Sequence, residues 1–248
     1  MKCKICLYHI CPQVLPLDGN SFAGVNIIGA SIRRNDGDGV LLNVNPNASL
    51  SDSSLAVLNF DKSFVNNNWG DGFHVTATNG IDDVTPPQTS GAIINFSNGS
   101  INNNGNFINA PATGIIGDGI GDGIDATATG DGSVAGNTQV TFNLNNTNIL
   151  GNEEQALKSA LTNGGSVNFN LVGGAINGAF AVPCADGPLA FVNFTLNGTS
   201  VASSSQLILC AKNNGTLIAN VANVDFSNNP GQGVILLAES GGDITANF

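Results

Sequence analysis

The stretch Val25-Asn26-Ile27-Ile28-Gly29-Ala30-Ser31-Ile32 contains the pattern that decides the fold of this 248-residue chain. An apolar residue is followed by a second one two positions later, by a small residue at plus five and by a third apolar residue at plus seven. Such alternation is typical of a strand with one buried face. The pattern occurs seven times, and its other copies are Leu58-Phe60-Ser63-Val65, Ile94-Phe96-Gly99-Ile101, Phe142-Leu144-Thr147-Ile149, Phe169-Leu171-Gly174-Ile176, Phe194-Leu196-Thr199-Val201 and, with a larger residue at the small position, Ala219-Val221-Val224-Phe226.

The copies follow one another at variable distances. Their second apolar residues are at 27, 60, 96, 144, 171, 196 and 221, so the steps are 33, 36, 48, 27, 25 and 25 residues. Repetition on this scale indicates one supersecondary unit stacked on copies of itself. A spacing with a constant minimum and a variable maximum is expected when the strands have a fixed length and their connecting turns accept insertions.

An asparagine recurs three residues after the third apolar position, where the chain is expected to turn. Asparagine tolerates left-handed backbone and forms local hydrogen bonds, which suits a turn. In stacked turns the side-chain amides would bond from one coil to the next as a ladder. The residues are Asn35, Asn68, Asn104, Asn152 and Asn229, with Ser204 substituting once.

From Val25 to Phe248 the chain resembles the right-handed parallel β-helix of pectin-lyase-like proteins and autotransporter passengers. We therefore expect an all-β protein, a single-stranded right-handed parallel β-helix (solenoid) of about seven coils over residues 21–248, after a flexible or capping leader over residues 1–20. A narrower likeness is Gly173-Gly174-Ala175-Ile176, which is similar to the Gly-Gly-Ala-Ile tetrapeptide of polymorphic outer-membrane passengers. This resemblance implies a secreted or cell-surface protein that continues into further coils or domains of a larger chain.

The composition excludes several classes of function. The chain has 18 acidic and 7 basic residues, a net charge of −11. Nucleic-acid binding needs clustered Lys and Arg, and attraction to anionic lipid needs the same, so neither is expected. No apolar run reaches the about 18 residues that span a bilayer, so no membrane insertion is expected.

The five cysteines fall into two groups. The leader holds three of them with one histidine, which leaves open a metal site, a degenerate export signal or a flexible leader. Cys184 and Cys210 are 26 residues apart, close to one coil. They are interpreted either as a disulfide between adjacent coils or as two buried thiols. The leader residues are Cys3, Cys6, His9 and Cys11.

The aspartate-glycine turns that follow the asparagines are the strongest candidates for a functional site. Asp38 and Asp71 are 71 − 38 = 33 residues apart, one coil, and Asp122 occupies the same place before Gly123. Equivalent positions of stacked coils lie about 5 Å apart, where like charges repel unless a cation or a raised pKa relieves them. The sequence thus predicts an acidic column of Asp38, Asp71, Asp122 and Glu154, with Glu153 beside it.

Three interpretations of this column stay open. The first is calcium binding, because carboxylates in glycine-rich loops suit Ca²⁺ and Gly121-x-Gly123-x-Asp125 resembles half of the nonapeptide calcium repeat of RTX proteins. The second is purely structural, since Asp and Gly are good turn formers. The third is catalysis. The calcium ligands would be Asp38, Asp71, Asp118, Asp122 and Asp125.

For catalysis the relevant resemblance is to inverting polygalacturonases, which Ile120-Gly121-Asp122-Gly123-Ile124-Asp125 matches in its Asp-Gly core alone. The Gly-His-Gly and Arg-Ile-Lys motifs of that family are absent, and no arginine follows Arg34. Paired carboxylates such as Asp71, Asp122 and Asp125 would still suit acid and base cleavage of a neutral glycan. His74 is expected to face solvent beside buried Phe73 and Val75.

The sequence as a whole favours a non-catalytic structural and adhesive module, because no complete catalytic set is present. Its partners would be glycans or cell-surface proteins, and its only expected cofactor would be calcium. The alternative is a glycan-cleaving hydrolase or lyase of the pectin-lyase-like group.

Overall fold

The computed structural model describes residues 16–17, 22–44, 54–78, 90–105, 121–130, 138–152, 155–162, 164–177, 180–202, 207–226 and 233–248. These residues form strands and turns, and none of them lies in a helix that could cross a membrane. Every pairing between their strands is parallel. The expected all-β architecture of stacked parallel strands is therefore confirmed, and it is compatible with a parallel β-helix.

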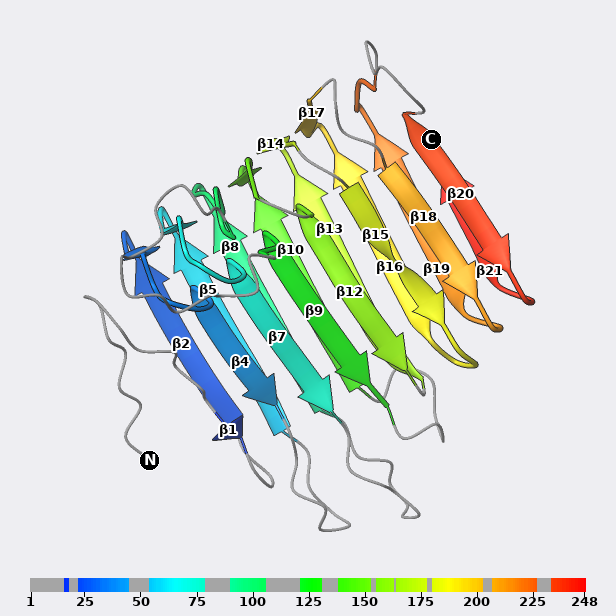
Figure 1. Ribbon diagram of the computed structural model, residues 1–248, viewed down its shortest axis with the longest axis horizontal. Helices are drawn as coiled ribbons and strands as arrows, with labels where there is room; N and C mark the ends of the chain where they lie inside the picture. The colour runs from blue at the N-terminus through cyan, green and yellow to red at the C-terminus, as the bar shows by residue number, and fades with distance from the viewer. Residues whose placement is uncertain are drawn as a thin grey trace.

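The longest sheet runs through the whole stack, from the first repeat to the last (Figure 1). We call each segment from one of its strands to the next a repeat. Its eight strands alternate between buried and more exposed residues over most of the sheet, as the apolar pattern requires. They are β2 (Phe22–Ile28), β5 (Ser54–Asp61), β8 (Ser90–Ser97), β10 (Thr138–Asn145), β13 (Gly165–Val172), β16 (Phe191–Asn197), β19 (Thr216–Ala222) and β21 (Asp243–Asn247).

A second layer of strands faces the first across the core (Figure 1). A five-stranded sheet contains β1 (Pro16–Leu17), β4 (Val40–Val44), β7 (Phe73–Thr78), β9 (Ile124–Thr129) and β12 (Leu157–Thr162). A three-stranded sheet contains β15 (Phe180–Asp186), β18 (Leu207–Lys212) and β20 (Val234–Glu239). Short strands at the turns complete the repeats, and they are β3 (Ser31–Arg33), β6 (Phe64–Asn66), β11 (Asn148–Ile149), β14 (Ala175–Ile176) and β17 (Ser200–Val201).

The register confirms the alignment of the repeats that the apolar pattern predicts. The second apolar residue of each copy faces that of the next: 27 pairs with 60, 60 with 96, 96 with 144, 144 with 171, 171 with 196 and 196 with 221. Steps that differ by more than twenty residues therefore produce the same register. The pairing of the described strands is thus independent of the length of the step.

Phenylalanine rings fill the space between the two main sheets. Phe73 of the five-stranded sheet meets three rings of the eight-stranded sheet, with centroids 5.3 Å from Phe60, 5.8 Å from Phe96 and 6.0 Å from Phe142. All four rings are fully buried. Edge-to-face contacts of this kind add to the free energy gained by burying the rings. The core therefore holds the two faces of the stack at a fixed distance.

Glycine follows each column aspartate because neighbouring repeats approach too closely for a Cβ. A Cβ on Gly72 would lie 2.5 Å from both the carbonyl oxygen of Gly123 and Cγ2 of Ile101. We expect Gly72→Ala to lower the free energy of unfolding by about 2 kcal/mol, measured by chemical denaturation. Gly37→Ala is the matched control, since nothing lies within 4 Å of the added carbon. An equal loss in both variants would contradict the close approach.

Candidate functional site

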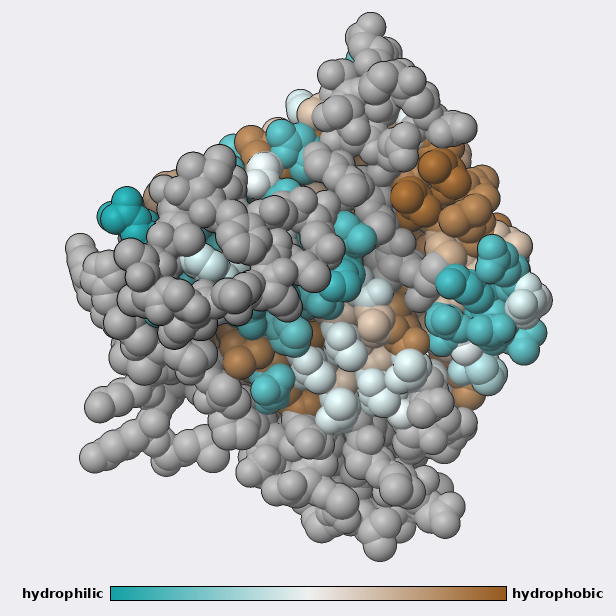
Figure 2. Space-filling model, in the orientation of Figure 1, coloured by the Kyte–Doolittle hydropathy of each residue, from teal (hydrophilic) through white to brown (hydrophobic). Residues whose placement is uncertain are grey.

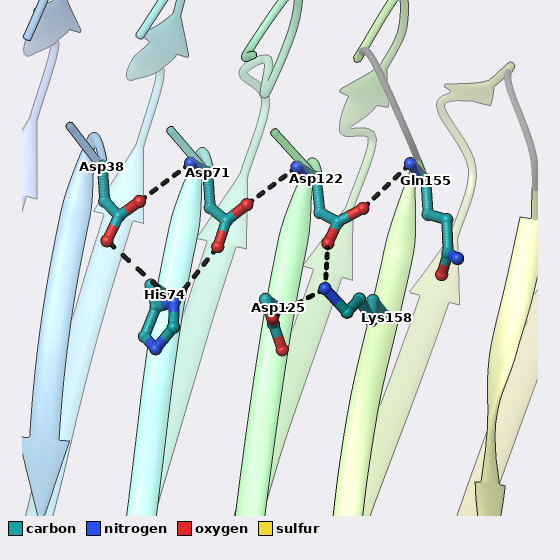
Figure 3. Close-up of polar contacts among 7 residues, drawn as sticks. All are labelled: Asp38, Asp71, His74, Asp122, Asp125, Gln155 and Lys158. Carbon is teal, nitrogen blue, oxygen red and sulfur yellow. Dashed lines mark hydrogen bonds and ion pairs between the residues drawn. The ribbon is translucent and has the colours of Figure 1, made fainter. Parts of the chain in front are cut away.

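Three aspartates occupy the same place in successive repeats, each two residues before a strand of the five-stranded sheet (Figure 3). In each carboxylate one oxygen accepts a hydrogen bond from the backbone N–H at the same place in the next repeat. Asp38 Oδ1 accepts from Asp71 at 2.9 Å, and Asp71 Oδ1 accepts from Asp122 at 2.8 Å. Asp122 Oδ1 accepts from the N–H of Gln155 at 2.9 Å. The aspartates are therefore joints between repeats.

The acidic column is confirmed for three of its four predicted members. The fourth place belongs to Gln155, whose backbone carbonyl also accepts from Gly123 N–H at 2.7 Å. The prediction of Glu154 in the column is wrong, because each place in the column lies two residues before a strand of the five-stranded sheet. β12 begins at Leu157, so the fourth place is residue 155. Glu153 and Glu154 lie outside the described residues.

A second row of side chains runs beside the column, three residues further along each repeat. His74 pairs in register with Leu41 on one side and with Asp125 on the other, and Asp125 pairs with Lys158. The two rows together contain four carboxylates, one lysine and one histidine (Figure 3). Sequence reasoning did not assign Lys158 to the site, although its offset of three from Gln155 repeats the offset of His74 from Asp71.

Lys158 bridges two of the carboxylates. Its Nζ lies 3.0 Å from Asp122 Oδ2 and 3.2 Å from Asp125 Oδ2. Burial raises the pKa of Asp122 to about 6, although the Lys158 ammonium acts in the opposite direction. Burial also lowers the pKa of Lys158, but the hydrogen bond to Asp122 and the charge of Asp125 outweigh it, so the net shift is upward. Lys158 is therefore a fixed positive charge at this end of the column.

His74 contacts the carboxylates at the other end of the column. Its Nδ1 lies 3.1 Å from Asp71 Oδ2 and 4.0 Å from Asp38 Oδ2. Since a carboxylate accepts, Nδ1 carries the hydrogen and donates it to Asp71. The pKa of His74 is raised, chiefly by this hydrogen bond and, against the effect of burial, by the charges of Asp38, Asp125 and Asp71. The expectation that His74 faces solvent misses this contact, because its side chain is half-buried against the column.

The structure places the predicted calcium ligands in two separate groups. Asp122 and Asp125 share the ammonium of Lys158. One ligand atom each from Asp38, Asp71 and His74 lie within 4.8 Å of one another. A histidine nitrogen in this set suits Zn²⁺ or a similar transition metal better than Ca²⁺, which prefers oxygen. Asp118 lies outside the described residues, and calcium binding stays a prediction.

The solvent exposure of the carboxylates limits the reactions that they could catalyse. The side chain of Asp122 is 1% exposed, that of Asp71 10% and that of Asp125 14%. Of the three residues predicted for glycan cleavage, Asp122 has the raised pKa of a general acid, yet it is the least accessible to a substrate. The residues are brought together, but their oxygens contact His74, Lys158 and the backbone of the next repeat.

Two asparagine ladders accompany the acidic column. The predicted ladder is buried, and its amide nitrogens donate along the stack from Asn35 to Asn68 at 2.8 Å, from Asn68 to Asn104 at 3.0 Å and from Asn104 to Asn152 at 3.0 Å. Asn229 and Ser204 lie outside the described residues. A second ladder, which the sequence analysis missed, follows the outer face of the eight-stranded sheet through Asn26, Asn59, Asn95, Asn143 and Asn170.

The predictions for the cysteines differ in outcome. Cys210 is disulfide-bonded, and the strand register places Cys184 of β15 opposite it. Both observations agree with the interpretation of a disulfide between adjacent repeats. The leader cluster of Cys3, Cys6, His9 and Cys11 lies outside the described residues. The sheet pairing already begins at Pro16 and Leu17, which pair with Asn43 and Val44.

Comparison with known proteins adds no family to this picture. No protein-family model matches the chain, and neither a curated protein nor a solved structure does.

Proposed function

We propose that this chain is a non-catalytic structural and adhesive module of a secreted or cell-surface protein. In finer detail, we propose a single-stranded right-handed parallel β-helix of about seven coils, of the pectin-lyase-like or autotransporter passenger type. One observation carries the proposal: Asp38, Asp71 and Asp122 each use one oxygen to hold the backbone of the next repeat. Residues with this structural role are required by the fold whether or not any substrate exists.

The second carboxylate oxygens support the same conclusion. Asp71 Oδ2 faces His74 and Asp122 Oδ2 faces Lys158. A glycosidase needs one protonated and one ionised carboxyl group on opposite sides of an accessible bond. Here the carboxylate with the pKa of about 6 is ion-paired and shielded. Glycan cleavage is therefore the weaker candidate.

The outer ladder offers the adhesive surface. Its amides stand in a straight row on the eight-stranded sheet, and Asn143 donates to Asn95 at 2.8 Å while Asn95 donates to Asn59 at 2.7 Å. Each amide keeps further hydrogen-bonding capacity toward solvent. A row of amides with a regular repeat of about 4.8 Å would bind sugar hydroxyls or an extended peptide weakly and repetitively.

A paired screen tests this proposal. The protein is incubated with neutral and acidic polysaccharides, and both released reducing ends and retained binding are measured. We expect no released sugar, and binding that weakens several-fold in Asn95→Ala with Asn143→Ala. Asn35→Ala, which alters the inner ladder, serves as the control. Sugar release that disappears in Asp71→Asn would establish the enzymatic alternative, and absence of binding to any glycan or cell surface would remove the adhesive part.

A further inference from the structure

His74 lies between two carboxylates that belong to adjacent repeats. Its Nδ1 is 3.1 Å from Asp71 Oδ2 and 4.0 Å from Asp38 Oδ2, and one ligand atom from each of the three residues lies within 4.8 Å of the others. Carboxylate oxygen and imidazole nitrogen are ligands of Zn²⁺ and of similar divalent transition metals. We propose that Asp38, Asp71 and His74 bind one such ion, Zn²⁺ or an ion of the same chemistry, and that it joins the repeat of Asp38 to the repeat of Asp71.

The backbone holds the two carboxylates of this site in place. Asp38 Oδ1 accepts the N–H of Asp71 at 2.9 Å, and Asp71 Oδ1 accepts the N–H of Asp122 at 2.8 Å. Gly70 leaves room for the Asp38 carboxylate, because a Cβ at Gly70 would collide with Oδ1. Hydrogen bonds of this kind orient a ligand and raise its affinity for a metal. The Oδ2 atoms are therefore kept on the side where His74 lies.

The three ligand atoms need a small adjustment to surround one ion. Ligands about 2.0–2.2 Å from Zn²⁺ are about 3.3–3.6 Å apart in a tetrahedral site. The distance from Nδ1 to Asp71 is close to this range, and the distance from Nδ1 to Asp38 exceeds it by less than about 1 Å. The side chain of Asp38 is 23% exposed, so it can rotate toward the ion. His74 would coordinate through Nδ1 and carry its hydrogen on Nε2, which points away from both carboxylates (Figure 3).

The other end of the column already holds a cation at the equivalent place. Lys158 occupies the position of His74 two repeats further along the stack. Its ammonium lies between two carboxylates, 3.0 Å from Asp122 and 3.2 Å from Asp125. The chain thus supplies its own positive charge where two carboxylates of this surface meet. The proposed ion would do the same at the place where the chain offers an imidazole.

Charge balance favours a divalent ion at the His74 end. At the Lys158 end one ammonium serves two carboxylates, a charge of 1 − 2 = −1. A neutral imidazole, the form that binds metal, leaves Asp38 and Asp71 with a charge of −2, and a divalent ion would cancel it, 2 − 2 = 0. Like charges at this distance repel each other unless a cation relieves them. A divalent ion therefore stabilises this end of the column.

Solvent reaches this side of the stack, so an ion can enter the site. The side chain of His74 is 36% exposed. Figure 2 shows hydrophilic residues at the surface over the starts of β9 and β12, the strands that follow β7 in the five-stranded sheet. Water would complete the coordination by the three described ligands. The histidine nitrogen favours ions such as Zn²⁺ and Co²⁺ over Ca²⁺, which prefers oxygen.

Metal titration of the full chain tests the proposal. Cys3→Ser, Cys6→Ser and Cys11→Ser are introduced first, because the leader thiols would bind Zn²⁺ as well. Calorimetry measures the binding of Zn²⁺, and visible absorption measures the binding of Co²⁺. We expect a single ion per chain. We also expect Zn²⁺ to raise the midpoint of thermal unfolding, an effect that the same concentration of Ca²⁺ does not reproduce.

Two substitutions in this background locate the ion. His74→Gln keeps a hydrogen-bond donor beside Asp71 but removes the imidazole, and Asp38→Asn keeps the shape of the side chain but removes its charge. Each should weaken Zn²⁺ binding at least about tenfold and abolish the rise in the midpoint, with an unchanged circular dichroism spectrum. His9→Gln, at the only other histidine of the chain, is the matched control and should bind Zn²⁺ as before.

Three results would overturn the proposal. The first is a chain that binds no Zn²⁺ once the leader cysteines are replaced. The second is Zn²⁺ binding that is as tight in His74→Gln as in His9→Gln. The third is a larger rise in the unfolding midpoint with Ca²⁺ than with Zn²⁺, which would assign the carboxylates to a site built for oxygen-preferring ions.

Discussion

Asn104→Ala should lower the free energy of unfolding by about 4 kcal/mol, because it leaves several buried polar groups without partners. Asn104 is fully buried, and its Oδ1 accepts both the backbone N–H and the side-chain amide of Asn68, at 3.1 and 3.0 Å. Its own amide donates to the carbonyl of Val65 at 3.1 Å and to Asn152 at 3.0 Å. Chemical denaturation monitored by circular dichroism measures the loss.

The outer ladder supplies a matched control for this substitution. Asn59 also donates to one asparagine and accepts from another, but water reaches its ladder. Asn59→Ala should therefore cost less than about 1 kcal/mol. If the two substitutions were equally costly, burial would not be what makes the inner ladder important. If Asn104→Ala were harmless, the inner ladder would be dispensable for folding.

Lys158→Met should lower the free energy of unfolding at neutral pH by about 3 kcal/mol, at the low end for a broken buried ion pair. The substitution leaves Asp122, whose side chain is 1% exposed, without its cation. The lower end applies because Lys158 is itself 39% exposed and water screens the pair. Lys62→Met, at an exposed lysine, is the control and should change stability by less than about 0.5 kcal/mol. Asp122→Asn in the Lys158→Met background should recover much of the loss.

The pH dependence of this variant follows from the pKa of Asp122. In the folded wild type that pKa is about 6, above the about 3.9 of an unfolded chain. The folded state therefore binds the Asp122 proton more tightly than the unfolded state does. The stability that this proton contributes is fully present below about pH 4 and is lost as the pH rises through about 6. Removing Lys158 raises the pKa of Asp122 further, so in the variant the decrease in stability with rising pH should continue to a higher pH than in the wild type. A variant whose stability is independent of pH in this range would refute the assignment.

Much of the fold was predictable because the core imposes its own spacing on the sequence. Ile27, Phe60 and Phe96 stand in register exactly where the apolar pattern places them, since a slip by one residue would expose every buried side chain. Insertions did not obscure the pattern, because it is local to each strand. The handedness of the stack and the number of coils are not set by this pattern and remain part of the proposal.

The candidate site was only partly predictable. Asp38, Asp71 and Asp122 were found because Asp-Gly recurs where repeats approach closely. Glu154 has the expected charge, but the column position is set by the distance to the following strand, and Gln155 is the residue two positions before β12. Lys158 was missed because a lone lysine has no sequence signature until the register sets it beside Asp122 and Asp125. The outer ladder was missed because Asn26 and its equivalents occupy solvent-facing positions, where any polar residue fits the pattern.

The in-register stacking of the repeats also determines how the protein would respond to force. Backbone hydrogen bonds run along the stack, so tension between the two ends loads them directly, one repeat boundary at a time. Opening either 25-residue step, from 171 to 196 or from 196 to 221, would release roughly 85 Å of extended chain. Under load the molecule would lengthen in steps, and the boundaries held by the aspartate joints, in the first half of the chain, would yield last.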